Sequence, residues 1–430
     1  MKRIFALLLC LMFGLALTVP TLAAQTGSFT IANPYKEVVW EGAGAWGAYK
    51  ANLHTHTTFS DGSESLKSMV EEYYAQGYDA IANTDHGVVS RPWDQKPMTV
   101  PILDLMTAFS SREVLSRGRA AEMAAGAGRG GRAMVQVPLG IEMNAATVYK
   151  SHVNGLYGGW GQGWWGVSTD YRTAIAGTQR RGGISFINHP GDWIKSENDP
   201  AAAEDPANVN FYVGIFRDYP SCLGMEAYNG SVSGATRYDR VLWDQILLRL
   251  MSEGRPVWGF ANDDSHSLGE IGRTAEMLFM PANTPENIRA CLESGAFLAC
   301  SRNDRVLGIE GDKTVPFPSV TNIVVNGNTI TLTTSDTTKV EWIADGKVIF
   351  VGDTIDLEFC ARHITCYVRA QLTGPGGIAT TQPFGVDKGD GYRHPDDALQ
   401  GWDLFEWNLK LYFTKNVFGW LVENVIKLFR

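Results

Sequence analysis

Residues 51–62 read Ala51-Asn-Leu-His-Thr-His-Thr-Thr-Phe-Ser-Asp-Gly62, and the interpretation of the whole chain starts from this stretch. It places His54 and His56 two residues apart, with Asp61 shortly after them. Residues two apart on a β-strand share a face, so both imidazoles can meet one metal ion where the strand runs into the Ser60–Gly62 loop. Exposed histidine pairs also occur by chance, so the rest of the chain has to support this prediction.

The first 24 residues predict a signal peptide. Lys2 and Arg3 precede an apolar run from Ile4 to Leu17, and Thr21–Ala24 supplies small residues for cleavage. The run is too short for an ordinary membrane span. We therefore expect an exported protein, either extracellular or periplasmic.

Charge and cysteine content narrow the possible partners. The formal net charge is −9, and it becomes more negative without the two basic residues of the signal peptide. Because phosphate contacts need basic surface, no nucleic-acid partner is expected. The cysteines include no Cys-x-x-Cys pair, so no zinc ribbon is indicated. Cys360 and Cys366 could bridge a hairpin in an oxidising compartment, and the other cysteines of the mature chain are expected to be free and buried.

Strand-like and helical runs alternate between about residues 48 and 302. Helices are predicted at 65–76, 237–252 and 284–293, and strands at 78–83, 133–142, 183–188, 222–228, 256–261 and 297–300. Such alternation predicts an α/β fold with a parallel sheet or a barrel. Polar groups recur at the carboxyl ends of the strands, where barrel enzymes keep their chemistry.

The amino-acid composition of the chain changes after Arg302. Residues 320–386 are rich in Thr, Val and Ile, and Asn326-Gly327 and Asp345-Gly346 are turn signals, which predicts a small antiparallel β-sandwich. A polar linker and an amphipathic helix at 402–430 follow. The predicted units are a signal peptide at 1–24, a lead-in at 25–47, a barrel at 48–303, a sandwich at 304–386, and the linker with its helical tail at 387–430.

Nine imidazole and carboxylate groups follow the predicted strands. They are His54, His56, Asp61, His86, Glu142, His152, His189, Asp264 and His266. Nitrogen and oxygen ligands of this kind suit Zn, Mn or Fe rather than one particular metal. Asp263 competes with Asp264, but the Asp-x-His spacing favours Asp264, and Asp263 is expected to be structural. Asp85 is expected to orient a ligand and belongs to the predicted catalytic set.

These motifs resemble the PHP (polymerase and histidinol phosphatase) family. The resemblance covers roughly residues 48–302. Residues 50–57 and 294–301 also resemble a branch of exported metallohydrolases in that family that includes a carbaryl hydrolase. The matching motifs are His54-Thr-His56 with Asp61, Thr84-Asp85-His86, Gly140-Ile-Glu142, His152, Asn188-His189-Pro190 and Asp264-Ser-His266.

The resemblance implies a distorted seven-stranded β/α barrel that binds two to three divalent transition metals. It assigns His54, His56, Glu142 and Asp264 to a first metal group. A second metal group shares Glu142 as a bridge and adds His152 and His189. A third metal group consists of Asp61, His86 and His266. A hydroxide between the metals would be the nucleophile, without any serine or cysteine.

Several other features carry open alternatives. Arg273 and Arg302 are candidates to clamp a phosphate, or else are scaffold arginines in ion pairs. The Gly126–Arg132 stretch could cradle an anion, although a mobile loop is the commoner interpretation. Trp160, Trp164 and Trp165 either wall a substrate pocket or cover one end of the barrel.

The sequence predicts an exported metal-dependent hydrolase, first of all a phosphoesterase acting on a small phosphorylated molecule. The same metals would also serve an ester or carbamate hydrolase. A third alternative is a non-catalytic cell-surface binding module. The 402–430 helix either packs on the protein or an oligomer, or makes peripheral contact with a membrane, which its aromatic residues favour and its acidic residues disfavour.

Overall fold

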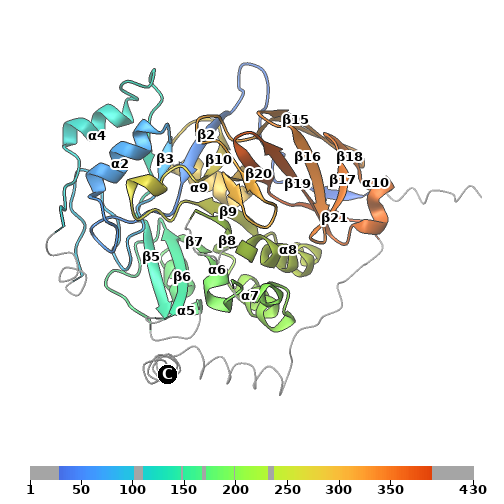
Figure 1. The fold of residues 1–430 in the computed structure, drawn as a ribbon, viewed down its shortest axis with the longest axis horizontal. Coiled ribbons are helices and arrows are strands. Elements are labelled where there is room, and N and C mark those ends of the chain that lie inside the picture. The colour runs from blue at the N-terminus through green and yellow to red at the C-terminus, as the bar shows by residue number, and fades with distance from the viewer. Residues whose placement is uncertain are drawn as a thin grey trace, which may run out of the picture.

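The computed structural model of this chain describes residues 29–100, 110–146, 149–166, 171–197, 199–230 and 237–389. The predicted signal peptide and the predicted helix at 402–430 lie outside these residues. The described chain is a mixed α/β fold with one half that alternates strands and helices and one half that is mainly β (Figure 1). In the described part, no helix is both long and apolar enough to cross a lipid bilayer.

The first half contains the predicted strand–helix alternation. Its strands are β2 (Gly47–Asn52), β3 (Ala80–Ile81), β4 (Val135–Gln136), β5 (Ile141–Ala146), β6 (Tyr149–Leu156), β7 (Ile184–Ile187), β8 (Cys222–Asn229), β9 (Trp258–Asn262), β10 (Thr274–Met280) and β11 (Phe297–Ser301). Its α-helices are α2 (Leu66–Ala75), α4 (Arg117–Ala124), α5 (Arg172–Arg180), α6 (Pro190–Ile194), α7 (Pro206–Asp218), α8 (Asp239–Leu250) and α9 (Pro285–Ser294).

The helices begin and end where the sequence indicates. The Ser65 hydroxyl accepts the backbone N–H of Ser68 at the start of α2, and Thr284 caps α9 in the same way through Asn287. Gly295 ends α9 with a φ of 77°, a conformation that glycine adopts without steric cost. The helices predicted at 65–76, 237–252 and 284–293 are therefore confirmed to within a few residues.

Strand pairing departs from a purely parallel arrangement. β2, β3 and β4 are parallel neighbours, as are β7, β8 and β9, but β6 runs antiparallel between β5 and β7, and β10 runs antiparallel to β2. The single strand predicted at 133–142 is wrong. Pro138 lacks an N–H and Leu139 has a φ of 58°, so the run breaks into β4 and β5.

Two isolated parallel bridges join strands of different sheets. Thr55 pairs with Ser265 after β2 and β9, and His86 pairs with Glu142 between β3 and β5. The edges of the five-stranded sheet, β5 and β9, thus meet the β2–β3 sheet at both ends. This arrangement brings the predicted ligands to one end of the fold.

The second half consists mainly of antiparallel strands. The elements are β12 (Asn303–Asp304), β13 (Ile309–Glu310), β14 (Ser319–Asn326), β15 (Thr329–Ser335), β16 (Lys339–Ala344), β17 (Lys347–Val351), β18 (Thr354–Asp356), α10 (Leu357–Cys360), β19 (Tyr367–Gly374), β20 (Gly377–Thr381) and β21 (Phe384–Asp387). Hairpins form at both predicted turns. Asp345 and Gly346 both have positive φ, as their two-residue turn requires.

The two halves share one hydrogen-bonded sheet. β20 pairs with β11, and β1 (Thr30–Ala32), from the predicted lead-in, pairs with β21. Cys360 and Cys366 are both free thiols, so the possible hairpin disulfide is not formed, and the other described cysteines are free and buried as expected.

A buried ion pair also ties the halves together. Arg369 on β19 is fully buried and bonds Asp244 on α8 through Nε–Oδ1 at 2.8 Å and Nη2–Oδ2 at 2.6 Å. The Tyr367 hydroxyl donates to the same carboxylate at 2.9 Å. Such a pair is costly to desolvate, but it is far more costly to break by removing one partner.

Replacing Asp244 with asparagine should therefore lower the free energy of unfolding by about 3–5 kcal/mol, because the arginine charge stays buried without its counter-ion. Chemical denaturation followed by circular dichroism measures this change. The control is Glu253→Gln, which breaks the half-exposed Arg217–Glu253 pair and should cost at most about 1 kcal/mol. Equal losses in the two variants would contradict a special role for the buried pair.

Candidate metal centre

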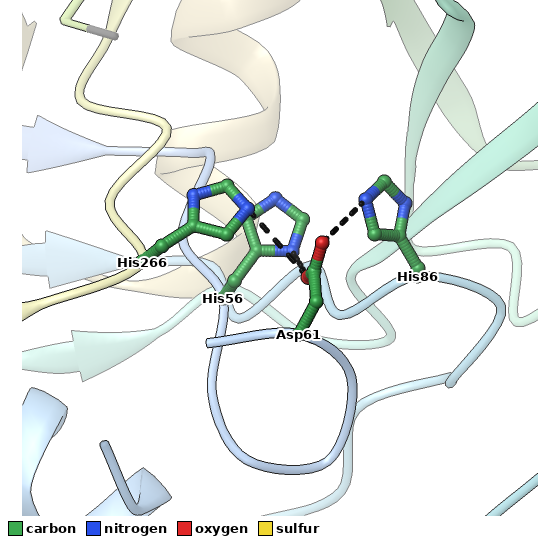
Figure 2. Close-up of side chains that lie close together, drawn as sticks. All are labelled: His56, Asp61, His86 and His266. Atoms are coloured by element: carbon green, nitrogen blue, oxygen red, sulfur yellow. Dashed lines mark ion pairs between the residues drawn. The ribbon is translucent and has the colours of Figure 1, made fainter. Parts of the chain in front are cut away.

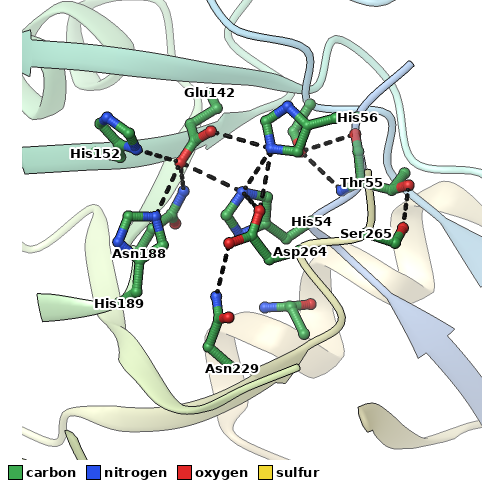
Figure 3. A network of polar contacts seen from close by, with 12 residues as sticks. His54, Thr55, His56, Glu142, His152, Asn188, His189, Asn229, Asp264 and Ser265 are labelled. Atoms are coloured by element: carbon green, nitrogen blue, oxygen red, sulfur yellow. Dashed lines mark hydrogen bonds and ion pairs between the residues drawn. The ribbon is translucent and has the colours of Figure 1, made fainter. Parts of the chain in front are cut away.

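The nine predicted ligands lie together at one end of the strands, around the carboxylate of Glu142. Glu142 is buried, and its two oxygens face five imidazoles, of which Figure 3 labels those of His54, His56, His152 and His189. The nitrogens of these imidazoles lie 3.3, 3.2, 3.1, 3.0 and 3.5 Å from the carboxylate, for His54, His56, His86, His152 and His189 respectively.

Pairing of the chain after β2 and β9 brings the first metal group together. The backbone N–H of Asp264 donates to the His54 carbonyl at 3.1 Å, and that of His56 donates to Ser265 at 2.9 Å. The Thr55 and Ser265 hydroxyls bond across this junction at 2.7 Å. Asp264 Oδ1 consequently lies 3.2 Å from Nε2 of both His54 and His56.

The second metal group is positioned by the antiparallel pairing of β5 with β6 and by the end of β7. His152 lies on β6, opposite β5, which carries Glu142, and His189 follows β7 directly. Asn188, the neighbour of His189, donates its side-chain amide to Glu142 Oε1 at 2.6 Å. The Glu142 carboxylate is therefore held by a hydrogen bond as well as by the imidazoles.

The third metal group lies on the more exposed side of the centre. Figure 2 shows Asp61 between His86 and His266, and its oxygens lie 3.5 Å from Nε2 of each. Asp61 and His266 are partly exposed, whereas His54 and His56 are completely buried. Gly62 closes the loop, because a Cβ there would lie 2.7 Å from the Thr57 nitrogen.

The donor atoms are spaced as the ligands of a shared cation would be. A metal about 2.0–2.2 Å from its ligands places neighbouring ligand atoms about 3.0–3.4 Å apart, in tetrahedral or octahedral geometry. His54 Nε2 and His56 Nε2 face each other at 3.1 Å. Nδ1 of His86 and of His152 are buried without hydrogen-bond geometry, although each lies close to Glu142. These residues therefore fit divalent metals, in keeping with four overlapping clusters of metal-ligating groups.

The electrostatics also favour cations in the centre. Burial alone would lower the pKa of His56, but hydrogen bonds that the carboxylates of Asp264 and Glu142 accept from the protonated ring outweigh it and raise that pKa to about 10. Burial would raise the pKa of Glu142, yet His86, His152 and His54 hold it well below its usual range. Burial lowers the pKa of His86 to about 4, which keeps it in the neutral form that binds metals.

Two ligands have unusual backbone conformations. His189 has a φ of 25° and Asp264 a φ of 48°, both in the left-handed region that residues other than glycine seldom adopt. Such conformations persist where the surroundings fix them, and they cluster at functional sites. Here, each places a ligand directly after a buried strand.

Glu226 is the main residue that the sequence prediction missed. It is fully buried on β8, and its Oε1 accepts from His54 Nδ1 at 2.8 Å. Its Oε2 accepts from the His189 backbone N–H at 2.9 Å and from the Asn229 amide at 2.8 Å. A carboxylate behind a metal-binding histidine fixes its tautomer and orientation. The sequence feature that could have indicated this role is that Glu226 is the single acidic residue in the otherwise uncharged run Leu223–Tyr228.

The two other acids are placed as the sequence suggests. Asp85 accepts from the Thr57 backbone N–H at 2.7 Å and from the Ser60 hydroxyl at 2.7 Å, so it holds the loop that carries Asp61. Asp85 thus acts on the ligands through the loop. Asp263 accepts from the backbone N–H groups of Gly272 and Thr274 and is structural.

The two predicted phosphate-clamping arginines differ in placement. Arg302 is buried, donates to three backbone carbonyls and stacks 3.7 Å above the Phe317 ring, which favours the scaffold alternative. Arg273 donates to the Gly230 carbonyl at 2.9 Å and lines a cavity beside the metal centre.

The remaining candidates mostly serve the scaffold. Arg129 and Arg132 of the Gly126–Arg132 stretch both bind Asp79, so these two guanidinium groups are engaged with the protein itself. Trp160 packs on Gly177, and Trp165 lies near Gly87, directly after His86. Trp165 thus lies beside the backbone that directly follows the predicted ligand His86.

Comparison with known proteins supports the PHP assignment for part of the chain. The family model of the PHP domain matches residues 52–198, about a third of the chain. The match contains seven of the nine predicted ligands, whereas Asp264 and His266 lie beyond it. No curated protein matches the sequence.

Solved structures with a similar arrangement include three named proteins. A two-domain protein from Bacteroides vulgatus containing a predicted PHP-like metal-dependent phosphoesterase is 19% identical, with a TM-score of 0.41, covering 79% of this chain and 87% of its own. A putative metal-dependent phosphoesterase from Bifidobacterium adolescentis is 15% identical, with a TM-score of 0.29, covering 51% and 88%. A lesion-specific endonuclease from Pyrococcus furiosus is 10% identical, with a TM-score of 0.34, covering 64% and 62%.

The PHP-domain match and the metal-ligating clusters together support an enzyme that uses divalent metals. The expected absence of a nucleic-acid partner stays a prediction. The exported branch with a carbaryl hydrolase also stays a prediction.

Glu226→Gln should lower metal affinity by about ten- to a hundredfold, because the amide no longer fixes the tautomer and orientation of His54. Titration calorimetry with Zn²⁺ on chelator-treated protein measures this change. The control is Glu276→Gln, at a buried carboxyl that contacts none of the described predicted ligands and whose pKa burial raises well above its usual value. A similar loss of affinity in both variants would reject the role of Glu226.

Proposed function

We propose that this chain is an exported, PHP-type metal-dependent phosphoesterase that acts on small phosphorylated molecules. The observation that carries the proposal is one buried carboxylate, Glu142, faced by five imidazole nitrogens at 3.0–3.5 Å. A bridging carboxylate among histidines is the donor set that multinuclear metal hydrolases use. The set contains no thiolate, which suits Zn, Mn or Fe.

The proposal includes two or three metals per chain, held by the three metal groups. When bound, these cations lower the pKa of a coordinated water and balance the charge that develops on phosphoryl oxygens. Glu142 holds two of the groups together, and Glu226 orients His54. Since Asp61 and His266 are the exposed ligands, substrate approaches from the third metal group.

The fold-level proposals are a distorted seven-stranded barrel and a β-sandwich. Strands β2, β3 and β5–β9, with the Thr55–Ser265 and His86–Glu142 bridges, support the barrel. The three-stranded sheet β14–β15–β18 and the neighbouring β16–β17–β19 strands support the sandwich. Export rests on the sequence of residues 1–24, and the membrane role of residues 402–430 rests on their sequence alone.

The metal assignment predicts different stoichiometries for two carboxylate variants. Glu142→Gln should lower occupancy of both the first and the second metal group, whereas Asp61→Asn should empty only the third. Elemental analysis of protein expressed in metal-replete medium gives the number of ions per chain. Equal loss of a single metal in both variants would refute Glu142 as the bridge.

The reaction class is tested by assaying metal-reconstituted protein against phosphomonoesters, phosphodiesters, carboxyl esters and carbamates. We expect hydrolysis of phosphate esters, with competitive inhibition by inorganic phosphate and vanadate, because both present phosphoryl-like oxygens to the metals. His54→Ala combined with His56→Ala should abolish turnover. Turnover of carboxyl esters or carbamates without inhibition by phosphate would reject the phosphoesterase and favour the alternative hydrolase.

A further inference from the structure

A second polar cavity lies beside the metal centre and is not explained by metal binding. Its volume is about 220 Å³. It lies between the end of β8, the start of α8 and the chain that follows β11. The lining residues are Ala227, Tyr228, Asn229, Gly230, Arg237, Arg240, Arg273, Ser301, Asn303, Asp304 and Arg305.

The cavity has an excess of positive charge among its lining residues, and Arg273 Nη1 also lies 3.8 Å from Glu270 Oε1 outside the lining. Four arginines line it against a single carboxylate, Asp304. That carboxylate is already engaged, because it accepts from Arg240 Nε at 3.1 Å and from the backbone N–H groups of Val306 and Leu307. Arg237 forms no ion pair with any residue that the structure describes. In an acidic protein, arginines gathered around one cavity indicate an anionic ligand.

One residue connects this cavity to the metal centre. Asn229 lines the cavity, and its amide donates to Asp264 Oδ2 at 3.3 Å (Figure 3). The same amide donates to Glu226 Oε2 at 2.8 Å. The other oxygen of Asp264, Oδ1, faces His54 and His56. The arginine cavity is therefore separated from Asp264, a predicted metal ligand, by the side chain of Asn229 alone.

Resting on the proposed function, we propose that the arginine cavity binds a second, non-reacting anionic group of the substrate. The substrate class is then a phosphate ester whose alcohol portion carries another phosphate, sulfate or carboxylate. Since the cavity is smaller than sites that enclose a whole drug-sized ligand, it accommodates one such group and not a large organic moiety. Arg273 recognises this remote group and does not act on the phosphoryl group that is transferred.

The test compares α,ω-alkanediol bisphosphates of two to six carbons with the alkyl monophosphates of the same lengths. We expect the wild-type enzyme to have a KM at least about tenfold lower for the best bisphosphate, since hydrogen bonds between charged groups are worth this much. Arg237→Gln and Arg305→Gln should each raise KM for the bisphosphate more than for the monophosphate. The matched control is Arg117→Gln, at an exposed arginine on α4, which should change neither KM.

The outcomes separate this inference from the proposed function. Equal KM values for both substrate series, unaffected by the variants, would overturn the second subsite and leave the phosphoesterase intact. Equal losses on both series in the arginine variants would also overturn it, because the cavity would then hold the reacting phosphate.

A binding measurement decides the case in which no phosphate ester is hydrolysed. Calorimetric titration of the metal-loaded protein with inorganic sulfate should show binding that Arg237→Gln and Arg305→Gln weaken about tenfold and Arg117→Gln does not. Sulfate binding unchanged in all three variants would overturn the anion site itself.

Discussion

The site depends on one constraint, which is that the negative charge of the buried Glu142 carboxylate has to be balanced by neighbouring groups. Glu142 is 1% exposed, and an isolated ionised carboxylate cannot remain in such a place without partners. The five imidazoles and the Asn188 amide provide those partners. They come from the ends of three strands, β2, β3 and β7, and from the β6 hairpin strand, so the site forms only when all these segments are in register. The metal groups therefore depend on the pairing of these strand ends.

The register is fixed outside the metal groups. The Thr55–Ser265 bridge aligns the chain after β2 with the chain after β9, which sets Asp264 against His54 and His56. Glu226 then connects His54 to the backbone of His189, and so couples the first metal group to the second. Hydrogen bonds outside the metal groups thus set the positions of the residues that would hold a cation in either group. This rigidity suits an enzyme, because ligands held in advance lose little freedom on binding metal.

The ligands could be predicted from the sequence because metal chemistry restricts them to histidines and acids at strand ends.

The strands themselves were harder to predict. The β6 run, Lys150-Ser-His-Val-Asn-Gly155, mixes polar and apolar residues, and no clear period marks it. Ser151 and Asn154 are both buried, and the Asn154 amide donates to the Leu53 carbonyl. Glu226 was hidden because a single sequence does not tell a buried, paired acid from one at a strand edge. The role of Arg302 was left open between a phosphate clamp and a scaffold arginine for a related reason. Its guanidinium donates to the backbone carbonyls of Asp312, Val315 and Gly376. Because every residue has a backbone carbonyl, the sequence does not reveal such partners.

The joining of β20 to β11 has a consequence for how the two halves work together. Ser301 at the end of β11, and Asn303 and Asp304 directly after it, line the arginine cavity, and β11 is also the strand on which β20 pairs. The Arg369–Asp244 ion pair holds the same β half against α8, whose first turn carries Arg240 into that cavity. The β half is therefore part of the wall of the proposed anion site through two independent attachments. Because the net charge of the chain is −9, this basic cavity is a local exception. Under the proposed function, an anion site walled in part by the β half would give that half a direct part in selecting the substrate.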